Sequence, residues 1–80
     1  MESPKYLNLA CGDSYVISSS WHNLDFVASS DFVVRANLLD RLPFPDNYFD
    51  IVYSSHFIEH IPVNQVCSFL TECFRVLKPR

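Results

Sequence analysis

Apolar and polar residues alternate in short stretches along this chain, and residues that favour turns separate the stretches. Residues 5–10 alternate as a strand does and lead directly into the turn-forming residues 11–14. The β-branched and aromatic content of residues 21–27, 32–38 and 49–55 predicts three more strands. Because the last stretch is an almost continuous apolar run, we expect it to be buried on both faces.

The remaining part of the chain carries the pattern of a helix. Pro62 suits a first helical turn, and apolar residues then recur at helical spacing until Pro79. The apolar positions are Val63, Val66, Leu70, Cys73, Phe74 and Leu77. Strands followed by a helix, with no hairpin-type two-residue turns, predict an α/β fold with a parallel sheet and abbreviated first crossovers.

Composition indicates an incomplete or partnered unit. The chain has 80 residues, of which 49% are hydrophobic and 19% charged, against about 25% charged in a typical globular protein. So short a chain forms only a marginal core. The balance therefore fits a piece of a larger fold, or a protomer that covers apolar surface with a partner, better than a free monomer.

Charge and cysteine content narrow the classes of partner and compartment. The net charge is −3 and the basic residues form no run, so we expect no nucleic-acid partner. No apolar stretch approaches the ~18–20 residues that span a membrane, and no signal-type segment opens the chain, which predicts a cytoplasmic protein. Three cysteines without metal-type spacing predict free thiols, with Cys67 and Cys73 packed as small hydrophobic residues.

Polar residues follow each predicted strand, which matters because open parallel sheets bind ligands beyond the carboxyl ends of their strands. The expected rim gathers residues 11–14, Asp25, Asn37 and residues 54–56. Gly12 is the only glycine in the chain, so close backbone approach to a ligand is easiest there. A carboxylate at the position of Asp25 can accept both hydroxyls of a ribose.

These residues belong to motifs that resemble those of class I S-adenosylmethionine-dependent methyltransferases, of the small methyltransferase-11-like type. In order, the motifs are Leu7-Asn8-Leu9-Ala10-Cys11-Gly12, Trp21-His22-Asn23-Leu24-Asp25, Asn37-Leu38, Leu42-Pro43-Phe44-Pro45-Asp46, Phe49-Asp50-Ile51-Val52, Ser55-His56-x-x-Glu59-His60 and Arg75-Val76-Leu77-Lys78-Pro79. They cover nearly the whole chain. The resemblance implies that residues 1–80 are one partial domain, the N-terminal cofactor-binding half of the fold.

The resemblance also implies the sheet, the cofactor and its contacts. The expected fold is a partial doubly wound, Rossmann-like parallel sheet of about four strands in the order 3-2-1-4, with a C-terminal helix. The implied cofactor is S-adenosylmethionine, and the implied methyl acceptor is a small molecule or a sugar-type molecule. The implied cofactor-binding residues are Ala10, Cys11, Gly12 and Asp13 in the first loop, Asp25 at the ribose, Asn37 and Leu38 at the adenine, and Ser55. His56 is the implied catalytic base, and no residue is assigned to a metal.

The chain departs from the family pattern at several positions. Ala10 and Ser14 stand where glycines are usual, and Asn37 stands where an aspartate is usual. The usual substrate-facing elements are not among these residues, so we expect the isolated chain to be inactive or weakly active. The fourth strand of the expected sheet has an open outer edge, which predicts a homo-oligomer or a missing C-terminal half as partner.

Two other functions remain open from the residues alone. A non-catalytic cofactor-binding or assembly module fits the same rim, and turnover would separate it from an enzyme. His56-x-x-Glu59-His60 matches the inverted zincin signature, in which two histidines one helical turn apart bind zinc. That hydrolase reading needs a continuous helix and a third ligand. At single positions, Gly12 also fits an ordinary turn, Asp25 a solvated strand end and Asn37 a turn cap.

Overall fold

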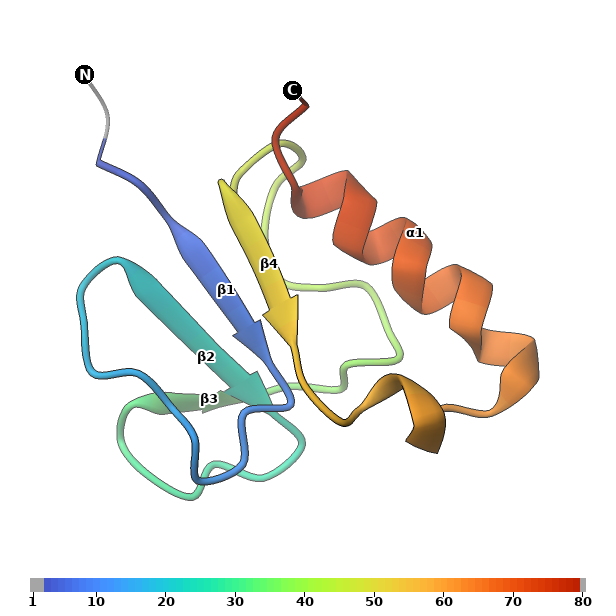
Figure 1. The fold of residues 1–80 in the computed structure, drawn as a ribbon, viewed down its shortest axis with the longest axis horizontal. Helices are drawn as coiled ribbons and strands as arrows, with labels where there is room; N and C mark the ends of the chain where they lie inside the picture. The colour runs from blue at the N-terminus through green and yellow to red at the C-terminus, as the bar shows by residue number, and fades with distance from the viewer. Residues whose placement is uncertain (1–2, 80) are drawn as a thin grey trace.

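The computed structural model describes residues 3–79, which form one parallel sheet with a helix beside it (Figure 1). The strands are β1 (Tyr6–Leu9), β2 (Trp21–Asp25), β3 (Val33–Arg35) and β4 (Ile51–Ser54), and their order in the sheet is β3-β2-β1-β4. Two 3-10 turns, η1 (Ile58–His60) and η2 (Val63–Gln65), lead into helix α1 (Val66–Val76). The predicted fold class and strand order are confirmed.

Register divides the sheet into two faces. Leu7 of β1 lies beside His22 of β2 and Val52 of β4, and Leu9 lies beside Leu24 in the same way. Because paired residues of parallel strands point to the same face, this face collects the fully buried leucines. It forms the hydrophobic core together with Phe49, Phe69, Val76 and neighbouring residues.

The opposite face of the sheet holds a polar network in place of a crossover helix. Asn8 and Asn23 are neighbours in the register and both are buried. Asn8 Nδ2 donates to Asn23 Oδ1 at 3.2 Å and to the Ser14 carbonyl at 3.1 Å. Asn23 accepts the Val16 N–H at 2.9 Å and donates to the Val16 carbonyl at 2.9 Å. This pair therefore fixes the irregular connection between β1 and β2. The connection begins with the loop that was predicted to bind a ligand.

The strands are shorter than predicted, and β4 is exposed. Strand β3 ends at Arg35, so Asn37 and Leu38 lie beyond its end. The prediction that residues 49–55 are buried on both faces is wrong, since Ile51 is 44% and Tyr53 51% exposed. Both residues pair with β1 residues on the face opposite the core leucines, and β4 is an outer strand of the sheet. A continuous apolar run does not distinguish an edge strand from a central one.

Helix α1 begins later than predicted, and only part of the predicted apolar stripe, including Val66 and Cys73, packs against the core. Pro62 precedes η2, and α1 starts only at Val66. Its buried residues are Phe69 and Val76, seven positions apart, whereas Val63 is 89% and Phe74 is 72% exposed. Cys73 packs against the core as predicted, but the prediction for Cys67 is wrong because this residue is exposed. Apolar residues occupy two sides of α1, and only one of them meets the sheet.

Residues near the end of α1 hold the loop that precedes β4. The Arg75 guanidinium lies between the Glu72 carboxylate, at 2.7 Å, and that of Asp46, at 2.9 Å. It also donates to the carbonyls of Leu42 and Phe44. Glu72 in turn accepts the Leu42 N–H at 2.7 Å.

Within residues 3–79, no helix has both the length and the apolar content that crossing a membrane requires.

Candidate functional site

The loop after β1 folds back onto the end of β2. The Ala10 and Cys11 N–H groups both donate to the Leu24 carbonyl, at 2.8 and 3.4 Å, and the Ser14 N–H donates to the Cys11 carbonyl at 2.8 Å. Ala10 and Gly12 have φ values of 55° and 53°, in the left-handed region that glycine adopts without strain. Ala10 thus keeps a glycine-like backbone at a position where the family usually has glycine. Asp13, the last predicted residue of this loop, is exposed.

Asp25 joins three strand ends through its side chain and its backbone. Its Oδ2 accepts the Gly12 N–H at 2.7 Å, and its Oδ1 accepts the Phe26 N–H at 2.7 Å. Its main-chain carbonyl accepts the Ala36 N–H, just beyond β3, at 2.8 Å. A carboxylate has about four acceptor positions, so each oxygen of Asp25 can accept a further hydrogen bond from a ligand. This residue is the centre of the rim.

A hollow lies beside Asp25, beyond the ends of β2 and β3. It has a volume of about 450 Å³ and is lined by Phe26, Arg35, Ala36 and Asn37. Ligand pockets typically occupy about 300–1,000 Å³, and the volume of this hollow lies within that range. Asn37 Oδ1 caps the following turn by accepting the Leu39 N–H at 3.1 Å, which leaves its amide nitrogen for a ligand.

Leu38 does not share this exposure. Its side chain is fully buried in the hydrophobic core. Only its main chain can therefore meet a cofactor, and its role as a cofactor contact stays a prediction for the backbone alone. The sequence predicted correctly that this segment lies at the rim. It did not show that Asn37 lines the hollow whereas the Leu38 side chain packs in the core.

The link after β4 brings an aromatic side chain to the rim. Phe57 lies 5.9 Å from Phe26, between ring centroids, and 5.2 Å from Phe69 of α1. Phe57 therefore contacts both Phe26, which follows β2, and Phe69 of α1. Neither Phe26 nor Phe57 is among the residues predicted from the sequence to lie at the site. An aromatic residue directly after the predicted ribose-binding acid was the available signal for Phe26.

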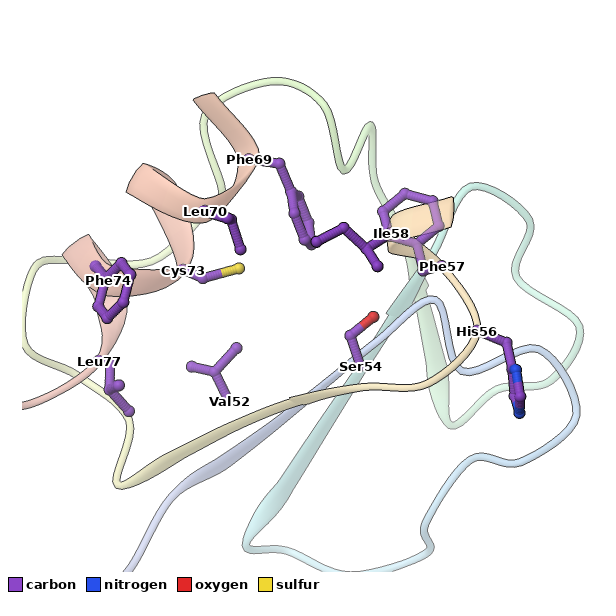
Figure 2. A pocket seen from close by; sticks show the side chains of 10 residues that line it. All are labelled: Val52, Ser54, His56, Phe57, Ile58, Phe69, Leu70, Cys73, Phe74 and Leu77. Atoms are coloured by element: carbon purple, nitrogen blue, oxygen red, sulfur yellow. The ribbon is translucent and has the colours of Figure 1, made fainter. Parts of the chain in front are cut away.

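His56 and Ser55 are exposed at the carboxyl end of β4. Figure 2 shows that His56 lies at the border of the cavity between β4 and α1, with its imidazole pointing outward, whereas the Ser54 hydroxyl points into that cavity. His56 has φ 56°, a left-handed conformation that ends the strand abruptly. It is thus free to meet a ligand at the rim, as the resemblance implies.

The backbone conformation of His56 also contradicts the zinc hypothesis, which needs His56 and His60 on one continuous helix. A left-handed residue cannot start a right-handed helix, and the only helical turn of this segment is η1, Ile58–His60. His56 and His60 therefore do not lie one turn apart on a common helix. Across residues 3–79, no three histidine, cysteine or acidic side chains are grouped as metal ligands.

Negative charge at the rim comes from its carboxylates. Burial is the main cause that raises the pKa of the Cys11 thiol, and the nearby Asp25 charge raises it further. The thiol therefore stays protonated at neutral pH, and it is nearly buried. Asp25 and Asp13 remain as the groups that can hold hydroxyl or amino donors of a ligand.

Comparison with known proteins agrees with this geometry. Residues 5–80 match the model of a family described as "Methyltransferase domain". A protein named "Probable methyltransferase ltbC", from Aspergillus luteorubrus, is 46% identical over 46 residues, which are 56% of this chain. The matched region spans only 16% of that relative's length. Since the family match covers nearly the whole sequence, this chain belongs to the methyltransferase domain family.

Proposed function

We propose that this domain binds S-adenosylmethionine at the rim and serves methyl transfer to a small-molecule or sugar-type acceptor. The observation that supports the proposal is the geometry of Asp25. Its carboxylate is fixed by two backbone N–H groups at 2.7 Å each, and both oxygens keep acceptor capacity toward the ligand side. Such a preorganised carboxylate suits the two neighbouring hydroxyls of a ribose.

The neighbouring residues fit the remaining parts of the cofactor. The hollow beside Asp25 offers the Phe26 ring as an apolar wall and the Asn37 amide as a hydrogen-bond donor for the adenine. The loop of residues 10–13 lies on the other side of Asp25, where the methionine part belongs. When bound, the cofactor supplies an electrophilic methyl group. The domain contributes mainly alignment, since holding two reactants in line accounts for much of such a rate enhancement.

His56 is the residue that can move a proton in this arrangement. If the acceptor is a hydroxyl, His56 would accept its proton at an imidazole nitrogen. The bound cofactor would supply the methyl group and would leave as the neutral thioether once its methyl–sulfur bond had broken. General-base assistance of this kind contributes about 10²–10⁴-fold to a rate. The His56 side chain is exposed at the carboxyl end of β4, which supports this role.

Competition binding with labelled S-adenosylmethionine tests the cofactor class. We expect unlabelled S-adenosylhomocysteine to displace the label, and ATP and NAD to leave it bound. Displacement by ATP or NAD at equal concentration would contradict the proposal, because it would show a general nucleotide site. Turnover on a panel of sugar and small hydroxyl acceptors then separates an enzyme from a cofactor-binding module. A saturable site with no product on any acceptor, even with an acceptor-binding half supplied, favours the module.

A further inference from the structure

The hollow beside Asp25 is lined mainly by side chains that donate hydrogen bonds or are apolar. Its lining residues are Phe26, Arg35, Ala36 and Asn37. Phe26 and Ala36 are apolar, so Arg35 and Asn37 are the lining side chains that can form hydrogen bonds. Because β3 and β4 are the two outer strands, this hollow lies at the far side of the sheet from β4 (Figure 1). The chemistry of these two side chains therefore decides which ligand groups the hollow can hold.

The orientation of the Asn37 amide follows from its partner in the protein. Its Oδ1 accepts the Leu39 N–H at 3.1 Å, and the Asn37 carbonyl accepts the Asp40 N–H at 3.2 Å. Turning the amide over would set its NH₂ group against the Leu39 N–H, and two donors cannot bond to each other. The hydrogen-bond network thus assigns the oxygen to the turn. The polar atom that Asn37 leaves for a ligand is Nδ2, which is a donor.

Arg35 adds a second group of donors and a positive charge. It is the last residue of β3 and pairs with Asp25 in the register. Its side chain is exposed, and within residues 3–79 the ion pairs are made by other basic residues. A guanidinium stays protonated and carries five N–H donors but no acceptor. The hollow thus offers a ligand mainly N–H groups and positive charge beside an apolar wall.

Purine bases differ in what they present to such donors. Adenine has ring-nitrogen acceptors and an amino donor at its 6-position, whereas a 6-oxopurine has an oxygen acceptor there. An N–H donor can bond to a ring nitrogen of adenine or to the O6 of a 6-oxopurine. A carboxylate in the same place accepts from the adenine amino group and repels O6, because both are acceptors. An amide nitrogen and a carboxylate therefore read the 6-position in opposite ways.

We propose that Asn37 makes the base-binding hollow of this domain tolerant of the purine 6-position, so that the 6-oxopurine form of the cofactor binds about as well as the adenine form. This inference rests on the proposed function, since it takes the hollow to hold the base of S-adenosylmethionine. Arg35 adds to the tolerance, because its positive charge favours the electron-rich O6. Phe26 contacts either ring system alike. Asn37 is thus the residue that sets base specificity.

Solvent exposure limits the cost of an unmatched group. Phe26 is 39% exposed, so the hollow is open to water, and a 6-substituent without a protein partner keeps a water partner. Neither base is then penalised for a buried, unpaired atom. We therefore expect the Kd values of the two forms to agree within about threefold. A carboxylate at position 37 should separate them by at least about tenfold, because it gains a charge-assisted bond with one base and repels the other.

Calorimetric titration with S-adenosylhomocysteine and with S-inosylhomocysteine, its 6-oxo analogue, measures this specificity. The wild type should bind both within about threefold of one another. Asn37→Asp should bind the 6-oxo analogue at least about tenfold more weakly than S-adenosylhomocysteine. The substitution keeps the side-chain size and an acceptor for the Leu39 N–H, so the turn after β3 is preserved. An unchanged circular dichroism spectrum confirms that the fold is intact.

Asn47→Asp is the matched control, because it makes the same chemical change before β4, at the amino-terminal ends of the strands. Asn47 has φ 55°, a conformation that aspartate also adopts. Its Kd ratio should equal that of the wild type.

Three results would overturn this inference and leave the proposed cofactor class in place. They are a wild-type ratio above about threefold, a ratio below about tenfold in Asn37→Asp, and an equal shift in Asn47→Asp. If the wild type binds neither ligand, the proposed function is wrong, and this inference falls with it.

Discussion

Replacing Arg75 tests how α1 holds the loop before β4. The five N–H donors of this guanidinium have protein acceptors, two on Glu72, one on Asp46 and the carbonyls of Leu42 and Phe44. The Arg75 side chain is only 14% exposed, and that of Glu72 only 18%. Arg75→Ala removes all five contacts, and it leaves a largely buried carboxylate without its counterion.

The expected cost follows from burial. Breaking a buried ion pair by removing one partner costs about 3–5 kcal/mol. The Asp46 side chain is 67% exposed, so water replaces that contact and its share is small. Water also reaches the vacated space, since the guanidinium is not fully enclosed. We therefore expect Arg75→Ala to lower the free energy of unfolding by about 2–3 kcal/mol, or Tm by roughly 10–20 °C in a domain of this size.

Thermal melts followed by circular dichroism measure this loss. Arg75→Lys is the matched control, because an ammonium keeps the charge but cannot span the same acceptors, so its Tm should fall in between. The Arg75 hydrogen bond is the main cause that lowers the pKa of Glu72 below its ordinary 4.5. That contribution is present above the unfolded-state pKa and is lost as pH falls through the folded-state pKa. The difference in Tm between the wild type and Arg75→Ala should thus become smaller below about pH 4.5. An unchanged Tm of Arg75→Ala at pH 7 would contradict the stabilising role of the Arg75 contacts with the loop before β4.

Two further predictions concern the first loop and the thiols. Ala10→Gly should raise the free energy of unfolding by about 0.5–1 kcal/mol in urea titrations, because Ala10 has φ 55°, whereas Gly12→Ala should lower it by about 1–2 kcal/mol. A loss of stability in Ala10→Gly would contradict the left-handed assignment. In native protein at pH 8, iodoacetamide should modify exposed Cys67 first, since burial raises the pKa of Cys73 to about 11. Equal labelling of both thiols by mass spectrometry would refute this order.

The sequence predicted the fold well where local pattern determines it. Turn formers around Gly12 and the alternation in residues 5–10 placed β1 correctly, and the order of elements gave a parallel sheet. Exposure was harder to predict, because it depends on neighbours. The predicted order 3-2-1-4 placed β4 at an edge correctly, but its apolar composition wrongly indicated that both of its faces are buried. Helix α1 has apolar residues on two sides, and periodicity alone did not show that Phe69, rather than Phe74, faces the sheet.

The candidate site was predicted residue by residue only in part. Asp25, Gly12 and Asn37 lie at the rim as expected, since Asp25 is the last residue of β2 and the other two lie in the loops after β1 and β3. Leu38 follows Asn37 in the sequence, yet its side chain belongs to the core. The contact between Phe26 and Phe57 joins residues far apart in the chain, so no local pattern carried it. Binding roles at the rim stay predictions that rest on the resemblance and on this geometry.

Calorimetric titration with S-adenosylhomocysteine tests the central claim most directly, that the rim around Asp25 is the cofactor site. Asp25→Asn keeps an acceptor for the Gly12 N–H but removes the charge, and Asp31→Asn changes an exposed acid before β3. We expect Asp25→Asn to lose a charge-assisted hydrogen bond of about 1.5–3 kcal/mol, roughly a 10- to 150-fold weaker Kd. Asp31→Asn should bind as the wild type does. Undetectable binding by the wild type, or an unchanged Kd in Asp25→Asn, would contradict the account.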